Sequence, residues 1–191
     1  MISSIEKENR KTLRRFDVPG HAHELTFSCF DKQPYLKDPA ICSIFMEEFA
    51  LAKSYFQFKI WAYVLMPTHV HLLIRPELEN YRIAVIQQHM KGKSSTRYRQ
   101  WILKNAIGRY AGFCVPAKGR KVFRLWLPGG GYDRNIWSGK ATHNVIRYID
   151  WNPVRAGLAK TPEEWPWSSA YARFVGKGIM PDMEGIPFKN Y

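Results

Sequence analysis

The chain has 191 residues, of which 46% are hydrophobic and 15% aromatic, so it can bury one core and extensive disorder is excluded. Its formal net charge of +13 favours a nucleic-acid partner over a membrane surface. Three cysteines without a C-x-x-C pair argue against a disulfide framework or a zinc ribbon. The sequence shows no apolar leader and no run of about 18 apolar residues, so we expect a soluble, cytoplasmic protein.

The positive charge is concentrated in one part of the chain. Residues 80–132 contain no Asp or Glu, and phosphate backbones are the commonest partner for such a surface. Residues 1–20 form a basic arm that either touches nucleic acid or is frayed. A generally basic, solvated surface is the alternative interpretation. Candidate DNA-binding residues are Arg14, Arg15, Lys91, Lys93, Arg97, Arg99, Lys118, Arg120, Lys121 and Arg124.

The chain is expected to begin its fold with a strand and a helix. Apolar and polar residues alternate over residues 24–30, which predicts the strand. Helical spacing over residues 38–56, opened by an Asp-Pro pair, predicts the helix. His21 and His23 form a His-x-His pair before the strand. They follow a Pro-Gly turn rather than lying in an apolar run, so they rank below the second such pair as a metal site.

That second pair lies on a predicted hairpin. Residues 58–66 are apolar on both faces, as in a strand covered on both sides, and a Pro-Thr turn leads into the next strand. Side chains alternate along a strand, so His69 and His71 would share one face. Two neutral imidazoles can hold a metal with open positions, suited to Lewis-acid work on a phosphate. The alternative is two histidines on a solvated strand face.

The remaining elements complete a fold class. We expect a second helix over residues 81–101 and a fourth strand over residues 121–127, with residues 129–131 as a flexible glycine connection. The order strand, helix, strand, strand, helix, strand predicts an α+β, ferredoxin-like split βαβ antiparallel sheet. Its helices would lie on one face, and the other face would be free.

A third helix is predicted from His143 to about Trp151, with Thr142 as its N-cap. Tyr148 and Asn152 are four residues apart, so their side chains would lie on the same side of it. Asn152 could instead cap the turn that follows. The aromatic extension after this helix could stack on bases, but docking on the core is favoured.

Two segments together resemble a known family. The sequence Met-Pro-Thr-His-Val-His-Leu-Leu at residues 66–73 resembles the HUH motif (His, hydrophobic, His), and residues 148–158 resemble the catalytic helix of single-tyrosine transposases. The sequences Asn-Pro-Val-Arg-Ala-Gly-Leu at 152–158 and Trp-Pro-Trp-Ser-Ser at 165–169 are similar to the REP-associated tyrosine transposases. These form a domesticated branch linked to repetitive extragenic palindromes in bacteria. The resemblance covers roughly residues 20–172.

The resemblance implies a site and a reaction. Tyr148, on an extra C-terminal catalytic helix, would be the nucleophile, while His69, His71 and Asn152 would hold Mg²⁺ or Mn²⁺. The tyrosine would attack single-stranded or hairpin DNA and remain bound to the 5′-phosphate. Bond energy is conserved in such a transesterification, so no nucleotide cofactor is needed.

The same resemblance frames the organisation of the chain. We expect a basic arm at residues 1–20, the transposase domain at residues 21–172 and a C-terminal tail at residues 173–191. The protein would act as a monomer or homodimer on the nucleoid in the cytoplasm, without contact to a membrane.

Two other functions compete with this prediction. A carboxylate-based nuclease with two metal ions would need clustered Asp or Glu residues, which are sparse near the predicted elements. A non-catalytic nucleic-acid-binding protein would not need the intact histidines and tyrosine. Tyr132, after the glycines, is the second candidate nucleophile.

Overall fold

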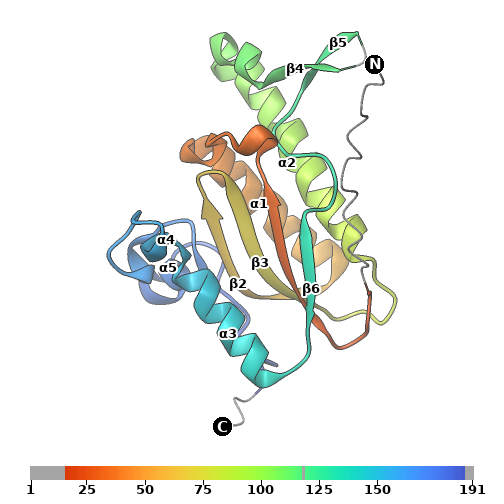
Figure 1. Ribbon diagram of the computed structural model, residues 1–191, viewed down its shortest axis with the longest axis vertical. Helices are drawn as coiled ribbons and strands as arrows, with labels where there is room; N and C mark the ends of the chain where they lie inside the picture. Colours follow the sequence, from red (N-terminus) through yellow and green to blue (C-terminus); the bar gives the residue numbers. More distant parts are fainter. Residues whose placement is uncertain (1–15, 118, 188–191) are drawn as a thin grey trace, which may run out of the picture.

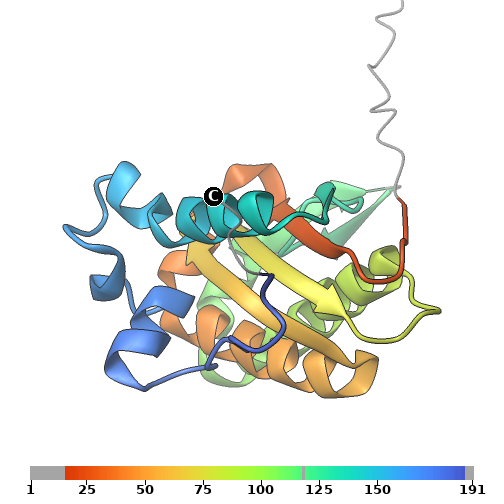
Figure 2. The same cartoon turned by 90° about the horizontal axis from the view of Figure 1, so that it is seen from below.

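The structure is a computed structural model that describes residues 16–117 and 119–187. Its centre is a four-stranded antiparallel sheet with strand order β2-β3-β1-β6 (Figure 1). Helices α1 and α2 cover one face of the sheet, and α3 lies on the other (Figure 2). The predicted α+β, split βαβ sheet is therefore confirmed. The elements named here are β1 (Ala22–Ser28), α1 (Pro39–Phe56), β2 (Phe58–Met66), β3 (His69–Pro76), α2 (Ile83–Asn105), β6 (Tyr132–Ile136) and α3 (Gly139–Asp150).

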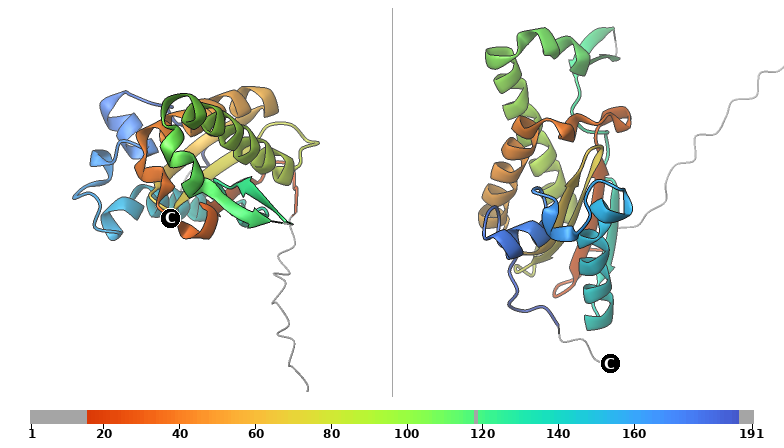
Figure 3. Two further views of the ribbon diagram at one scale, coloured as in Figure 1. Left: turned by 90° about the horizontal axis from the view of Figure 1, so that it is seen from above. Right: turned by 90° about the vertical axis from the view of Figure 1, so that its left-hand side faces the viewer.

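Smaller elements extend this framework. A two-stranded hairpin of β4 (Cys114–Ala117) and β5 (Arg120–Phe123) projects beyond the sheet near the end of α2 (Figure 3). Two short helices, α4 (Asn152–Arg155) and α5 (Ser169–Val175), follow α3. Short 3₁₀ turns occupy Phe30–Lys32, Tyr35–Lys37, Ile107–Phe113 and Pro162–Glu164. Among the described residues, every helix is too short or too polar to cross a membrane.

Local sequence accounts for the first half of the fold. The side chain of Asp38 accepts a hydrogen bond from the Ala40 amide at 2.9 Å, and Pro39 follows at a position where its missing N–H does no harm. This pair starts α1 where the sequence predicted it. The predicted hairpin is also confirmed, because Met66 on β2 pairs with His69 on β3 across the Pro-Thr turn.

The core has two parts, one on each face of the sheet. The larger lies between the sheet and helices α1 and α2 and includes Phe27, Phe45 and Val70. The smaller lies under α3 and contains Trp61 and Val145. The sequence had suggested that the face opposite α1 and α2 would be free. That expectation is wrong, because the apolar stripe of α3 covers this face above β2 and β3.

The prediction that residues 121–127 form the fourth strand of the sheet is wrong. Residues 120–123 pair with β4 in the separate hairpin, and the fourth strand of the sheet is β6. Only Asp133 and Ile136 are buried in β6, so its sequence lacks an apolar alternation. The preceding Gly131 is a tight joint, since its φ is +71° and a Cβ there would lie 2.1 Å from the Thr26 carbonyl oxygen.

The start of α3 also differs from the prediction. Its N-cap is Ser138, whose hydroxyl accepts a hydrogen bond from the Ala141 amide at 3.3 Å. Thr142 lies inside the helix, where it is buried and donates its hydroxyl to the Ser138 carbonyl at 3.0 Å. Ser and Thr are both favoured at N-caps, so the sequence alone did not show which of Ser138 and Thr142 starts the helix.

The C-terminal segment docks along the outer edge of β2. The Leu65 amide donates to the Trp167 carbonyl at 2.9 Å, and the Ile60 amide donates to the Asp182 carboxylate at 2.7 Å. The Trp165 indole donates to the Leu65 carbonyl at 2.9 Å. Docking of the aromatic extension, favoured from sequence, is therefore confirmed.

Candidate active site

The histidine pair on β3 converges on one point. Val70 and Leu72, which alternate with the histidines along β3, lie in the core between the sheet and helices α1 and α2. His69 and His71 therefore share the opposite face, on which α3 lies. Their Nε2 atoms are 3.1 Å apart. Two imidazole nitrogens that bind one ion at about 2.1 Å and at right angles are about 3.0 Å apart. The pair therefore fits two adjacent positions on a single metal ion.

Two threonine hydroxyls orient the imidazoles. Thr26 Oγ1 lies 2.8 Å from Nδ1 of His71, and Thr68 Oγ1 lies 2.9 Å from Nδ1 of His69. We assign Nδ1 as the protonated nitrogen in each ring, so that it donates to the hydroxyl and leaves the Nε2 lone pair for a metal. These threonines were missed from sequence.

Burial keeps the imidazoles neutral. It lowers the pKa of His69, and burial together with the neighbouring His69 lowers the pKa of His71 to about 4. Only a neutral imidazole offers a lone pair to a metal, so the pair is ready to bind one at neutral pH. His71 is 6% exposed, which places it under α3 rather than on an open strand face.

Helix α3 brings Tyr148 to the histidines of the same chain. The Tyr148 and His71 rings meet edge to face, with centroids 5.4 Å apart. The guanidinium of Arg155 lies 5.3 Å from the centre of the tyrosine ring. Tyr148 is 39% exposed and therefore accessible to a substrate.

His71 and Tyr148 border a cleft of about 490 Å³, whereas His69 and Arg155 are not among its lining residues. Its floor includes Glu24 on β1 and Arg134 on β6, which face each other in the sheet and form an ion pair at 2.6 Å. Tyr132, the second candidate nucleophile, lies at the start of β6 and also lines the cleft. The cleft is lined by Glu24, Thr26, His71, Tyr132, Arg134, Asn144, Val145 and Tyr148.

Asn152 lies close in sequence but does not line this cleft. It is the first residue of α4, one turn after Tyr148, and is partly buried. Residues 16–117 and 119–187 contain no cluster of three His, Cys, Asp or Glu side chains suited to a metal ion.

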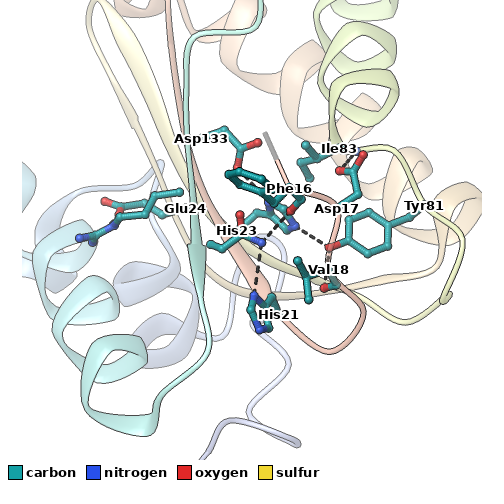
Figure 4. A network of polar contacts seen from close by, with 11 residues as sticks. Phe16, Asp17, Val18, His21, His23, Glu24, Tyr81, Ile83 and Asp133 are labelled. Carbon is teal, nitrogen blue, oxygen red and sulfur yellow. Dashed lines mark hydrogen bonds and ion pairs between the residues drawn. The ribbon is translucent and has the colours of Figure 1, made fainter. Parts of the chain in front are cut away.

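His23 belongs to a different network, shown in Figure 4. It is fully buried, with Nδ1 2.8 Å from Asp133 and Nε2 2.7 Å from the Tyr81 hydroxyl. The Tyr81 hydroxyl also donates to the Val18 carbonyl at 2.9 Å. Because both of its ring nitrogens contact protein groups, His23 joins β1, β6 and the loop that precedes α2. The ring of His21 stacks on Trp137.

Most of the basic residues predicted to bind DNA lie away from the histidines. Helix α2 is on the opposite face of the sheet, and three of its basic side chains have partners within the protein. Arg97 pairs with Glu47 and Glu48 of α1, Arg99 donates to the Tyr110 hydroxyl, and Lys91 donates to the carbonyls of Leu127 and Gly129.

The other predicted contacts are more accessible. Lys93 on α2 and Arg120 and Lys121 on β5 are exposed, and Arg124 is partly exposed. Arg14, Arg15 and Lys118 lie outside the described residues.

Three comparisons with known proteins point to the same kind of protein. Residues 20–110 match the family described as "Transposase IS200 like". A Haemophilus influenzae protein predicted to be a REP-associated tyrosine transposase is 28% identical over 138 residues, which are 68% of each chain. A solved REP-associated tyrosine transposase bound to a REP hairpin has the same fold, with a TM-score of 0.64 at 18% identity, over 95% of this chain and 99% of that one.

Residues 20–110 are similar to the IS200-like transposases, and the fold with a histidine pair beside a helix-borne tyrosine is in keeping with that similarity. Within that class the chain resembles the REP-associated tyrosine transposases, and the recognition made from its sequence motifs is confirmed.

Proposed function

We propose that this chain is a metal-dependent endonuclease and strand transferase that cuts and rejoins single-stranded or hairpin DNA, with Tyr148 as the nucleophile. The observation that carries this proposal is the edge-to-face contact of Tyr148 with His71, whose Nε2 converges with that of His69. If the two imidazoles held a metal ion, a tyrosine beside them would be placed near a phosphodiester bound there.

His69 and His71 would hold Mg²⁺ or Mn²⁺, and Asn152 is proposed as the third protein ligand. When bound, the ion would polarise a phosphodiester oxygen and offset the charge that develops on it. No nucleotide cofactor takes part.

The proposed reaction forms one phosphate ester, on the tyrosine, and breaks another, in the DNA backbone. The tyrosine hydroxyl gives up its proton to water as the oxygen forms a bond to phosphorus. The bond from phosphorus to the 3′-oxygen breaks, and the leaving oxygen takes up a proton to become a 3′-hydroxyl. The strand beyond the break stays attached to Tyr148 through its 5′-phosphate. The reverse attack by a 3′-hydroxyl then joins DNA ends. Arg155 lies against the tyrosine ring, where its charge would attract the incoming phosphate.

The proposed substrate is a REP-type palindrome with a single-stranded flank. The related solved structure holds a REP hairpin, and a reacting phosphate can enter the cleft only if a partner strand does not shield it. The net charge of +13 supports a phosphate-rich partner on the nucleoid in the cytoplasm. Because His71 and Tyr148 meet within one chain, we propose that a single protomer can assemble the site.

A covalent adduct is the decisive test. We would incubate the protein and Mn²⁺ with 3′-labelled hairpins that carry randomised single-stranded flanks, then separate the products on a denaturing gel. The label should migrate with the wild-type protein, because the 3′ fragment remains on the tyrosine. Tyr148→Phe should give no adduct, whereas the matched Tyr132→Phe should still form one. An adduct on the Tyr148→Phe protein would refute the assignment of the nucleophile.

A further inference from the structure

Arg134 is a charged residue of the cleft that has no part in the reaction proposed above. It lies on β6 opposite Glu24 of β1, with which it pairs in the sheet. Side chains alternate along a strand, so Arg134 points to the α3 face, opposite to Asp133, which is buried against His23. Arg134 and Tyr148 therefore line the same cleft from two sides, one from the sheet and one from α3.

The guanidinium of Arg134 is held along one edge. Its Nε donates to Oε2 of Glu24 at 2.8 Å, and its Nη2 lies 2.6 Å from the same oxygen. A guanidinium has five N–H donors, and this edge uses one on Nε and one on Nη2. The end of the fork, formed by Nη1 and the second N–H of Nη2, has no bonded partner in residues 16–117 and 119–187.

The two partners of this ion pair differ in burial. The side chain of Glu24 is 8% exposed, whereas that of Arg134 is 52% exposed. The buried carboxylate therefore fixes the guanidinium while the end of the fork stays open to the cleft. Two parallel N–H groups match two oxygens of a phosphate. Because the carboxylate offsets part of the positive charge, the fork supplies direction more than long-range attraction.

Two other paired arginines show what distinguishes Arg134. Arg97 has a carboxylate of α1 on each of its Nη atoms, so the end of its fork is occupied. Arg109 is closer to Arg134, since its side chain is 51% exposed and its Nη2 lies 2.6 Å from Asp38. Arg109 does not line the cleft beside Tyr148. Of these three, Arg134 combines an open fork with a place in that cleft.

The position of Arg134 favours a phosphate next to the reacting one. Thr26, which contacts His71, is two residues from Glu24, or about 7 Å along β1. Strands β3 and β6 flank β1, so they are about 10 Å apart. The Cα atoms of His71 and Arg134 are thus about 12 Å apart in the sheet. Two successive phosphates of one strand span this separation better than a single phosphate does.

We propose that the open end of the Arg134 fork binds the phosphate next to the phosphodiester that reaches Tyr148, and that Glu24 positions the guanidinium for this contact. This inference deepens the proposed function and rests on it for the identity of the strand. Arg134 aligns the single strand in the cleft, whereas Tyr148 acts on the adjoining phosphodiester.

The test counts phosphate contacts without cleavage. Fluorescence anisotropy would follow the binding of a labelled dT decamer to the Tyr148→Phe protein, without metal, over a range of salt concentrations. One lost phosphate contact on a single strand reduces the slope of log affinity against log salt by about 0.7, whereas a lost base contact releases no counterions and leaves it unchanged. Adding Arg134→Gln should reduce the slope by about 0.7 and weaken binding about tenfold, as expected for one hydrogen bond between charged groups. The matched Arg109→Gln should change neither quantity.

Variants of Glu24 separate this contact from a purely structural ion pair. Arg134→Gln leaves a buried carboxylate unpaired, which destabilises the fold by itself. Glu24→Gln keeps an acceptor for Nε, so the slope should not fall. Glu24→Gln with Arg134→Gln removes both charges, so thermal unfolding should return toward that of the parent protein. The slope of this double variant should nevertheless stay about 0.7 less steep, because the phosphate contact is still lost.

An unchanged slope in Arg134→Gln, the same change in Arg109→Gln, a reduced slope in Glu24→Gln, or a slope that recovers in the double variant would each overturn the proposal. If the slope depends on Arg134 but no phosphotyrosine adduct forms, the phosphate contact stands and the cleavage function falls. If the adduct forms and the slope does not depend on Arg134, the cleavage function stands and this contact falls.

Discussion

Replacement of Thr26 by Val tests how the hydroxyl behind His71 contributes to metal binding. Valine keeps the branched shape but removes the oxygen that lies 2.8 Å from Nδ1. The loss of a net hydrogen bond of about 0.5–1.5 kcal/mol corresponds to about 2–10-fold in affinity. Removal of groups that orient metal-binding histidines typically costs about 10–100-fold. The two ranges meet near tenfold, so we expect Thr26→Val to weaken Mn²⁺ binding by about 1.4 kcal/mol.

Titration calorimetry with Mn²⁺ would measure that affinity directly, and adduct yield against Mn²⁺ concentration would measure its functional consequence. The midpoint of the yield curve should move about tenfold, while the plateau at saturating Mn²⁺ should hold, because Tyr148 is untouched. Thr142→Val is the matched control, since it removes a buried, hydrogen-bonded hydroxyl from α3 without touching the histidines. An unchanged midpoint in Thr26→Val, or the same shift in Thr142→Val, would refute the reasoning.

Two further predictions concern stability and DNA binding. His23→Leu should lower the free energy of unfolding in urea by about 3 kcal/mol, because it leaves the buried Asp133 carboxylate without its histidine, and His23→Leu with Asp133→Leu should recover part of that loss. A fully stable single variant would contradict this role. Lys93→Ala should reduce the slope of log affinity against log salt for single strands by about 0.7, the effect of one lost phosphate contact. Arg97→Ala should leave the slope unchanged, since its guanidinium already pairs with carboxylates of α1, and equal slopes for both variants would argue against this distinction.

The features that could be predicted from sequence are those encoded locally. The turn between β2 and β3, the start of α1 and the shared face of His69 and His71 depend on residues within a few positions of one another. Strand β6 was missed because it is an edge strand with mostly polar residues, and its pairing with β1 depends on a partner about 110 positions earlier.

The supporting groups of the site could not be read from the sequence for the same reason. Thr26 reaches His71 only through the pairing of β1 with β3, and Arg97 is occupied only because α1 packs beside α2. Arg134 meets Glu24 only through the pairing of β6 with β1.

The docked C-terminal segment has a consequence for solubility. An edge strand with free amide groups is a template on which other chains can aggregate. In β2 the outward amides of Ile60, Tyr63 and Leu65 are bonded to residues 167–182 instead. A chain shortened before residue 165 would retain the histidines and Tyr148, yet it would expose nine residues of largely apolar strand to its neighbours. We therefore expect residues 167–182 to limit self-association by covering this edge, although none of these residues lines the cleft.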